Sequence, residues 1–159
     1  MPETPERLVE RLSSEGQKTL EFFCALSPEQ WESTVYSTGS QWNARQVLAH
    51  FVSAEDAFII LMQNILEGGS GAPEDFDIDR FNEHEVAMLN LATPAELLEQ
   101  FAVQRQASAR LVARMTPEDL PKVGRHPFLG AVPLEDIIKL LYRHNQIHQR
   151  DVRRLLSQI

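Results

Sequence analysis

The sequence predicts an all-α protein built as a four-helix bundle. Apolar residues recur every three to four positions in four long segments, and Thr or Asn stands at the start of three of them as a helix cap. No segment shows the sustained apolar–polar alternation of a β-strand. Of the 159 residues, 43% are hydrophobic, which is enough for a core, and no change of composition marks a boundary. We therefore expect one domain over residues 1–159.

The first helix is predicted over residues 5–26. Thr4 is placed to cap it, and Pro5 suits the first helical position. Its apolar stripe consists of Leu8, Leu12, Gly16, Leu20 and Phe23. The following SPEQW segment, residues 27–31, predicts one short extra turn.

The second helix has the clearest start signal in the chain. Asn43 and Gln46 have the spacing of a capping box, and the helix should run to about Glu67, before two glycines. The inward stripe includes His50, Ala54 and Phe58. Glu55 and Asp56 fall outside this stripe, so they are predicted to face solvent.

Three further segments complete the helical pattern. A helix over residues 78–90 is capped by Asp77, and another over residues 94–115 begins with Thr93, Pro94 and Glu96. A second short turn is possible at residues 116–120. Residues 121–133 contain three prolines and are predicted to be a loop with short extended pieces at most. The last helix is predicted over residues 134–157.

Composition and charge limit the classes of function. The net charge of −8 argues against a nucleic-acid partner, which needs clustered Lys and Arg. The single cysteine, Cys24, cannot form an internal disulfide and is predicted to be a small core residue. No signal peptide and no apolar run long enough to span a membrane is evident. These features predict a cytoplasmic protein with no membrane partner.

Three of the five histidines fall on predicted inward stripes. His144 and His148 lie four positions apart on the last helix, so their side chains share one face, and His50 lies on the inward stripe of the second helix. Three imidazoles of this kind are suited to bind one metal ion and leave positions open for water or substrate. The alternative is that each is a core histidine paired with a polar group. His84 and His126 are predicted to be surface or loop histidines.

Several named motifs are absent. The sequence HNQIH has Asn145 where a zinc protease of the HExxH type carries its glutamate. No histidine follows a glutamate by three residues, as di-iron bundles require. There is no CxxC pair and no phosphate-binding glycine loop, so these metal and nucleotide classes are excluded.

The segments QWNARQVLAHFVSAED, FDIDRFNEHEV and HPFLGAVPLEDIIKLLYRHNQIHQRDVRRLL resemble the DinB/YfiT-like superfamily of metal-dependent enzymes. The resemblance covers nearly the whole chain. It implies an up-down-down-up bundle in which His50, His144 and His148 bind a divalent metal, with Zn or Ni favoured over Fe or Mn. It also implies hydrolase or thiol-transferase chemistry on a small-molecule substrate, sometimes with a low-molecular-weight thiol, and a homodimer.

Two further residues are candidates for lining the site, and each has an alternative. Asp151 shares a face with His148 and would orient an imidazole, or pair with Arg154 in solvent. Asn82 matches a family position in DIDRFN and would line the pocket, or cap a local turn. No catalytic residue is assigned. The function is therefore either a metal-dependent enzyme or a non-catalytic bundle whose metal or histidines only stabilise the core.

Overall fold

The computed structural model describes residues 2–158, and its long helices confirm the predicted all-α bundle. The elements occur in the order α1 (Pro5–Cys24), α2 (Pro28–Trp31), α3 (Ala44–Leu66), α4 (Ile78–Met88), α5 (Pro94–Ala113), β1 (Val123–His126), β2 (Gly130–Pro133) and α6 (Leu134–Leu156). Each predicted helix begins at the expected residue and ends within two residues of its expected end. The segment at residues 117–121 forms only a hydrogen-bonded turn.

The helix starts form as the cap residues predict. The side chain of Thr4 accepts a hydrogen bond from the backbone N–H of Arg7. In α3 the Gln46 backbone N–H donates to Asn43 Oδ1, and the Asn43 N–H donates to Gln46 Oε1, both over 2.9 Å. Thr93 begins α5 with the same reciprocal pair. These bonds satisfy N–H groups that have no partner within the helix, which fixes where each helix begins.

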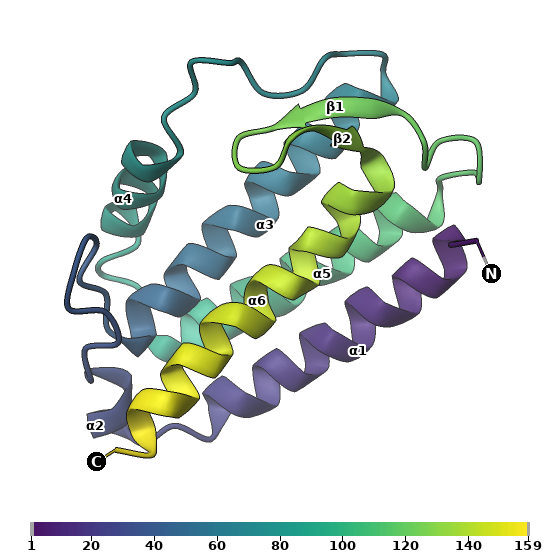
Figure 1. Cartoon of the computed structure of the whole chain (residues 1–159). Helices are drawn as coiled ribbons and strands as arrows, with labels where there is room; N and C mark the ends of the chain where they lie inside the picture. Colours follow the sequence, from purple (N-terminus) through teal and green to yellow (C-terminus); the bar gives the residue numbers. More distant parts are fainter. Residues whose placement is uncertain (1, 159) are drawn as a thin grey trace.

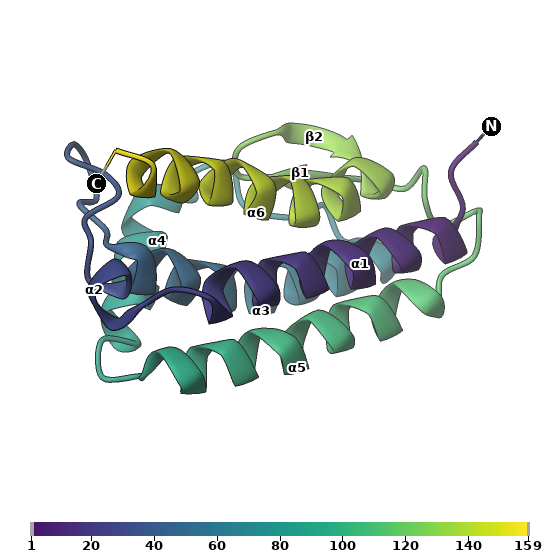
Figure 2. The ribbon, with the colours of Figure 1, turned by 90° about the horizontal axis from the view of Figure 1, so that it is seen from below.

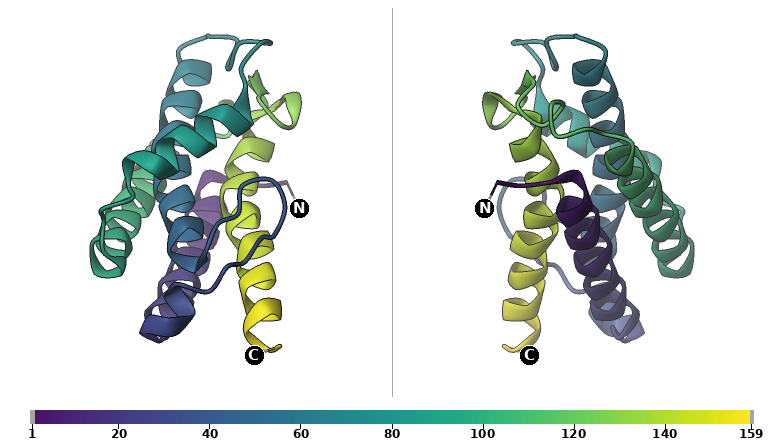
Figure 3. Two further views of the ribbon diagram at one scale, coloured as in Figure 1. Left: turned by 90° about the vertical axis from the view of Figure 1, so that its left-hand side faces the viewer. Right: turned by 90° about the vertical axis from the view of Figure 1, so that its right-hand side faces the viewer.

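The four long helices run up, down, down and up (Figures 1 and 2). Helices α1 and α6 run in one direction, and α3 and α5 run in the other. Because α3 and α5 are parallel neighbours, the chain between them must return along the bundle. Residues 67–93 make this return and include α4, which packs on α3 outside the four-helix core (Figure 3).

The short extended pieces that were allowed in the loop at residues 121–133 are the two paired strands of an antiparallel hairpin, and this pairing was not predicted. Strand β1 pairs with β2 in the register Val123 to Pro133 and His126 to Gly130. The prolines do not interrupt the pairing because they stand before β1, in the turn, and at the end of β2. Gly130, with a φ of 79°, supplies the left-handed conformation at the turn. The hairpin lies along α3 and α6, with its turn above the middle of α3 (Figure 1).

The core consists of two apolar clusters with a buried polar layer between them. The first cluster is centred on Leu8, Met62 and Leu141, and the second on Phe23 and Phe51. The polar layer contains Glu55, Thr19, Arg105, Ser108, Asn145 and Gln149.

Glu55 is fully buried in this layer, which corrects the prediction that it faces solvent. Helix α3 contacts both α5 and α6, so its buried arc is wider than one stripe. Glu55 faces Arg105 of α5, whose guanidinium donates to both carboxylate oxygens over 2.6–3.2 Å. Ser108 donates to the same carboxylate over 2.9 Å. The exposed position of Asp56 is as predicted.

Arg105 also reaches the other two long helices. It donates to the backbone carbonyl of Leu12 in α1 and to the side-chain oxygen of Asn145 in α6. Gly16 of α1 makes room for it, since a Cβ there would stand 2.8 Å from Arg105 Cγ. One buried side chain therefore links all four long helices.

Cys24 is exposed at the end of α1, so it is not the core residue that was predicted. Across residues 2–158, no helix has both the length and the apolar character needed to cross a membrane.

Candidate metal centre

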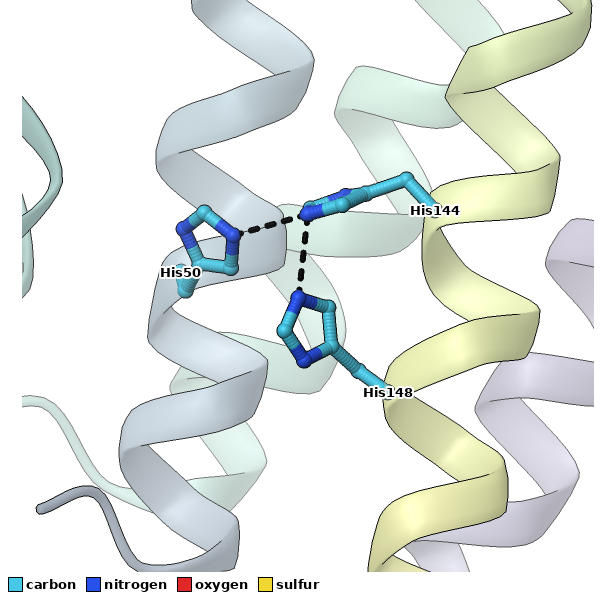
Figure 4. Close-up of side chains that lie close together, drawn as sticks. All are labelled: His50, His144 and His148. Carbon is cyan, nitrogen blue, oxygen red and sulfur yellow. Dashed lines mark hydrogen bonds between the residues drawn. The ribbon is translucent and has the colours of Figure 1, made fainter. Parts of the chain in front are cut away.

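The structure brings His50, His144 and His148 together between α3 and α6. The Nε2 atoms of His50 and His144 lie 2.8 Å apart, and those of His148 and His144 lie 3.2 Å apart (Figure 4). One ligating nitrogen from each ring lies within 4.8 Å of the others. The four-residue spacing on α6 places the rings of His144 and His148 on one face of the helix. The packing of α3 against α6 brings the ring of His50 to the same place.

Aromatic side chains surround the cluster. The Trp42 ring lies 4.9 Å from the His50 ring, and the Phe51 ring lies 5.7 Å from both His144 and His148. Burial lowers the pKa of His50 to about 3, helped by neighbouring His148. Burial also lowers the pKa of His144 and of His148. All three imidazoles are therefore neutral at physiological pH, which is the form that binds metals.

Tyr36 and Asp151 hold the outer side of His148. The Tyr36 hydroxyl donates to Asp151 Oδ2 over 2.7 Å and lies 2.6 Å from His148 Nδ1. Since the hydroxyl proton is used on Asp151, the Tyr36 oxygen accepts from His148 Nδ1–H. This arrangement leaves the lone pair of His148 on Nε2, toward the cluster. Burial and the Asp151 carboxylate raise the pKa of Tyr36, so its hydroxyl stays protonated.

Asp151 therefore acts on the imidazole through Tyr36, which sequence reasoning did not identify. Tyr36 lies in the segment between α2 and α3, 112 positions before His148. No local pattern around it signals a role at the site. Only the packing of this segment against α6 reveals the contact.

The donor set fits a metal ion. Bonds of about 2.0–2.1 Å in a tetrahedral site would place the ligand nitrogens about 3.3 Å apart, close to the distances found here. Three neutral Nε2 atoms around one point repel each other through their lone pairs unless a cation or a proton lies between them. Within residues 2–158, Nδ1 of His50 and Nδ1 of His144 are buried without a hydrogen-bond partner. The contacts between the three rings are therefore made by their Nε2 atoms alone.

Asn82, His84 and His126 are not part of the histidine cluster. Asn82 is partly exposed on α4 and makes no side-chain hydrogen bond within the described chain, so it neither caps a turn nor bonds to the histidines. His84 is exposed, as predicted. His126 is buried rather than on the surface, because it is on the inward face of the hairpin.

An open surface depression of about 360 Å³ lies beside Trp42. It is lined by residues 39–42, Gln46 and three residues of α4 (Glu83, Val86 and Ala87). The Trp42 ring contacts His50 and also lines this depression, whereas none of the three histidines lines it.

Comparison with known proteins shows the family of this chain. Residues 11–152 match the model of the DinB superfamily. No protein of curated function matches the sequence. The solved structures that share the fold include the following three. A DinB-like protein from Bacillus cereus is 17% identical with a TM-score of 0.55, the chains being covered to 99% and 94%.

The other two solved structures are of proteins whose names state what they act on or bind. The mycothiol-dependent maleylpyruvate isomerase is 16% identical with a TM-score of 0.74; the match covers 96% of this chain but only 61% of the isomerase. The colibactin self-resistance protein ClbS, solved in complex with double-stranded DNA, is 12% identical with a TM-score of 0.73, and the match covers 99% of this chain and 96% of ClbS.

The ClbS complex corrects the exclusion of nucleic acid. That exclusion rested on net charge, which is a sum over the whole molecule, whereas binding depends on local charge. Helix α6 carries four exposed arginines on this acidic chain: Arg143, Arg150, Arg153 and Arg154. A net charge of −8 is therefore no ground for excluding a nucleic-acid partner.

Proposed function

The chain belongs to the DinB superfamily, and from this premise we propose that it is a metal-dependent enzyme that acts on a small molecule. The observation that carries the proposal is the convergence of three neutral Nε2 atoms between α3 and α6. His50, His144 and His148 would hold a divalent ion, with Zn or Ni favoured over Fe or Mn because a site of nitrogen ligands generally binds Fe and Mn less tightly.

A bound ion would supply Lewis acidity and would lower the pKa of a bound water or thiol. The residues of the chain would prepare the site for this chemistry. The three histidines are neutral, so they leave the full positive charge of the ion in place. Tyr36 and Asp151 orient His148, and Trp42 and Phe51 limit the access of bulk water.

Glu55 is the carboxylate of the polar layer, but it is not available as a general base. Its oxygens accept hydrogen bonds from Arg105 and Ser108, and both partners are buried with it. The reaction we propose is therefore one in which the nucleophile needs no carboxylate base: hydrolysis, or transfer of a small thiol. The mycothiol-dependent isomerase that shares the fold supports the thiol branch.

The test begins with the metal. Protein purified without a metal-affinity tag should contain about one ion per chain by elemental analysis. His148→Ala should lose most of this metal because one ligand is missing, whereas His84→Ala, at an exposed histidine, should keep it. Metal-loaded protein is then assayed with ester, amide and epoxide substrates, with and without small thiols. Equal metal content in the two variants would contradict the proposed site.

The alternative, a structural metal in a non-catalytic bundle, gives a different result. A structural site is closed by a fourth protein ligand, whereas a catalytic site keeps an open position. Cobalt(II)-loaded protein distinguishes the two, because an open site changes its visible spectrum when azide is added. A cobalt spectrum that azide leaves unchanged, with no turnover of any substrate, would favour the structural role.

A further inference from the structure

His126 is a buried histidine that the proposed metal site does not use. Its side chain is only 7% exposed, and its Nδ1 accepts two backbone hydrogen bonds in the hairpin turn, from Phe128 over 3.0 Å and from Leu129 over 3.2 Å. An imidazole nitrogen that accepts N–H groups carries no proton. The neutral ring therefore carries its proton on Nε2.

This Nε2–H is the free end of the ring. No hydrogen bond to it occurs among residues 2–158, and it is not among the fully buried atoms without a partner. The little exposed surface of His126 thus includes its donor. Burial lowers the pKa of His126 to about 4, so the ring stays neutral at physiological pH and the donor is permanent.

The hairpin holds this donor on the side of the metal centre. Gly124 and His126 are the buried positions of β1, and a Cβ at Gly124 would meet Ile65 of α3, so this face of the strand lies on α3. Two residues further along β1, the His126 ring packs on Phe58 with centroids 5.4 Å apart. The strand thus runs along α3 toward the half that carries His50.

Phe58, on which His126 packs, lies on the same apolar stripe of α3 as His50. Phe58 and His50 lie eight positions apart on α3, which is about 12 Å along the helix. Between them on the same stripe is Ala54, a small and half-buried side chain. His126 is also near enough to His144 to contribute to lowering its pKa. A ligand bound at the cluster would therefore need a chain of several bonds to reach His126.

We propose that His126 is a substrate-orienting residue, whose Nε2–H donates a hydrogen bond to an oxygen of the small molecule bound at the histidine cluster. The substrate class is then a compact molecule with a carbonyl or carboxylate oxygen several bonds from its reacting atom. This inference rests on the proposed function, because it needs a ligand at the metal centre.

The experiment uses cobalt(II)-loaded protein and dicarboxylates from malonate to adipate as probes. One carboxylate binds the cobalt, which reports through its visible spectrum, and the other reaches His126 at the right chain length. His126→Asn keeps an acceptor for the turn N–H groups, since Asn suits such turns, but it removes the ε donor. It should weaken the best dicarboxylate about 10-fold. The matching monocarboxylate should bind unchanged.

A conservative variant tests the donor of His126, and a direct measurement locates its proton. His126→Gln, whose amide N–H reaches further than that of Asn, should recover part of the affinity. Nitrogen-15 spectra of the imidazole should show the proton on Nε2 of His126. Unchanged dicarboxylate affinity in His126→Asn, or a proton on Nδ1, would overturn the inference. A chain that binds no cobalt would instead contradict the proposed function.

Discussion

The hydroxyl group of Tyr36 holds the orientation of His148, one of the three proposed metal ligands. It joins His148 Nδ1 to the Asp151 carboxylate across two elements of the fold. Groups that hold the outer nitrogen of a ligating histidine fix its tautomer and raise its basicity. The position of this hydroxyl therefore affects metal affinity without any contact between Tyr36 and the ion.

Tyr36→Phe should lower metal affinity about 10-fold, within the range typical for loss of such a partner. The ring remains to fill its space, so the fold should be kept. The measurement is a competition titration against a coloured chelator. Tyr142→Phe is the matched control, because Tyr142 is also buried but its hydroxyl makes no hydrogen bond in the described chain. Equal losses in the two variants would contradict the role of Tyr36.

Single residues of the site differ in how far the sequence reveals them. The inward positions of His50, His144 and His148 follow from helical spacing, which is a local property, and the family resemblance predicts that the three meet. Tyr36 and Glu55 do not follow, because each is defined by a partner on a distant element. For Glu55, the helix pattern gives the centre of the inward face, but only the position of Arg105 on α5 shows how wide that face is.

The hairpin is the element that places His126 and covers the α3–α6 side of the bundle. A third segment supports it: Gly71 bridges to Arg125 of β1, and Ala72 donates to the Arg125 carbonyl over 2.8 Å. Gly71 has a φ of 90°, and a Cβ there would meet the Arg125 backbone. The return segment between α3 and α4 is thereby fastened to the hairpin.

Gly71→Ala should destabilise the protein by about 3 kcal/mol, from an unfavourable φ and from overpacking against the Arg125 backbone. Gly130→Ala is the matched control. It also has a positive φ, but no atom lies within 4 Å of the added Cβ, so it should cost only about 1 kcal/mol. Denaturant unfolding measures both free energies. A smaller loss for Gly71→Ala than for Gly130→Ala would show that the hairpin does not depend on this approach.

Helices α1, α3 and α5 were predictable because each has its own start signal, such as the reciprocal bonds of Asn43 and Gln46, and α6 was predictable from its apolar stripe. The hairpin was not, because its evidence is not local. Residues 121–133 contain prolines, which normally argue against strands. Whether these prolines interrupt strand pairing depends on the register between the two strands. The partner contacts at Ile65 and Gly71 come from segments more than fifty residues earlier.

At the scale of the whole molecule, Arg105 connects the four long helices through buried hydrogen bonds. Removing one partner of a buried ion pair leaves the other charge without compensation. Arg105→Met should therefore lower the free energy of unfolding by about 3–5 kcal/mol. Arg110→Met, at an exposed arginine of the same helix, should change it by less than about 0.5 kcal/mol. Similar values for the two variants in urea unfolding would contradict this account.

Metal binding should stabilise the whole bundle, because an ion held by α3 and α6 is bound only in the folded state. Adding a chelator to metal-loaded protein should lower the melting temperature by several degrees at pH 7.5. Calorimetry with and without the chelator measures this change. An unchanged melting temperature after proven metal removal would contradict it.

Acid should weaken even the metal-free protein. The pKa of His50 is lowered to about 3 in the folded chain, whereas an unfolded histidine titrates near 6.5. Between these values the unfolded state binds more protons, so stability falls as the pH drops from about 6.5 toward 3. His50→Gln should flatten this slope in urea unfolding of metal-free protein. A slope equal to that of the wild type would show that His50 does not cause the acid sensitivity.

The wide separation of the histidines along the chain has a consequence for biosynthesis. His50 is made 94 residues before His144, so a ribosome-bound nascent chain that has not yet released α6 displays only one of the three proposed metal ligands. Such a chain cannot compete for scarce cellular metal. An ion would then be bound by all three ligands only after α6 has been translated and has packed against α3. Prematurely terminated chains would bind no metal at this site.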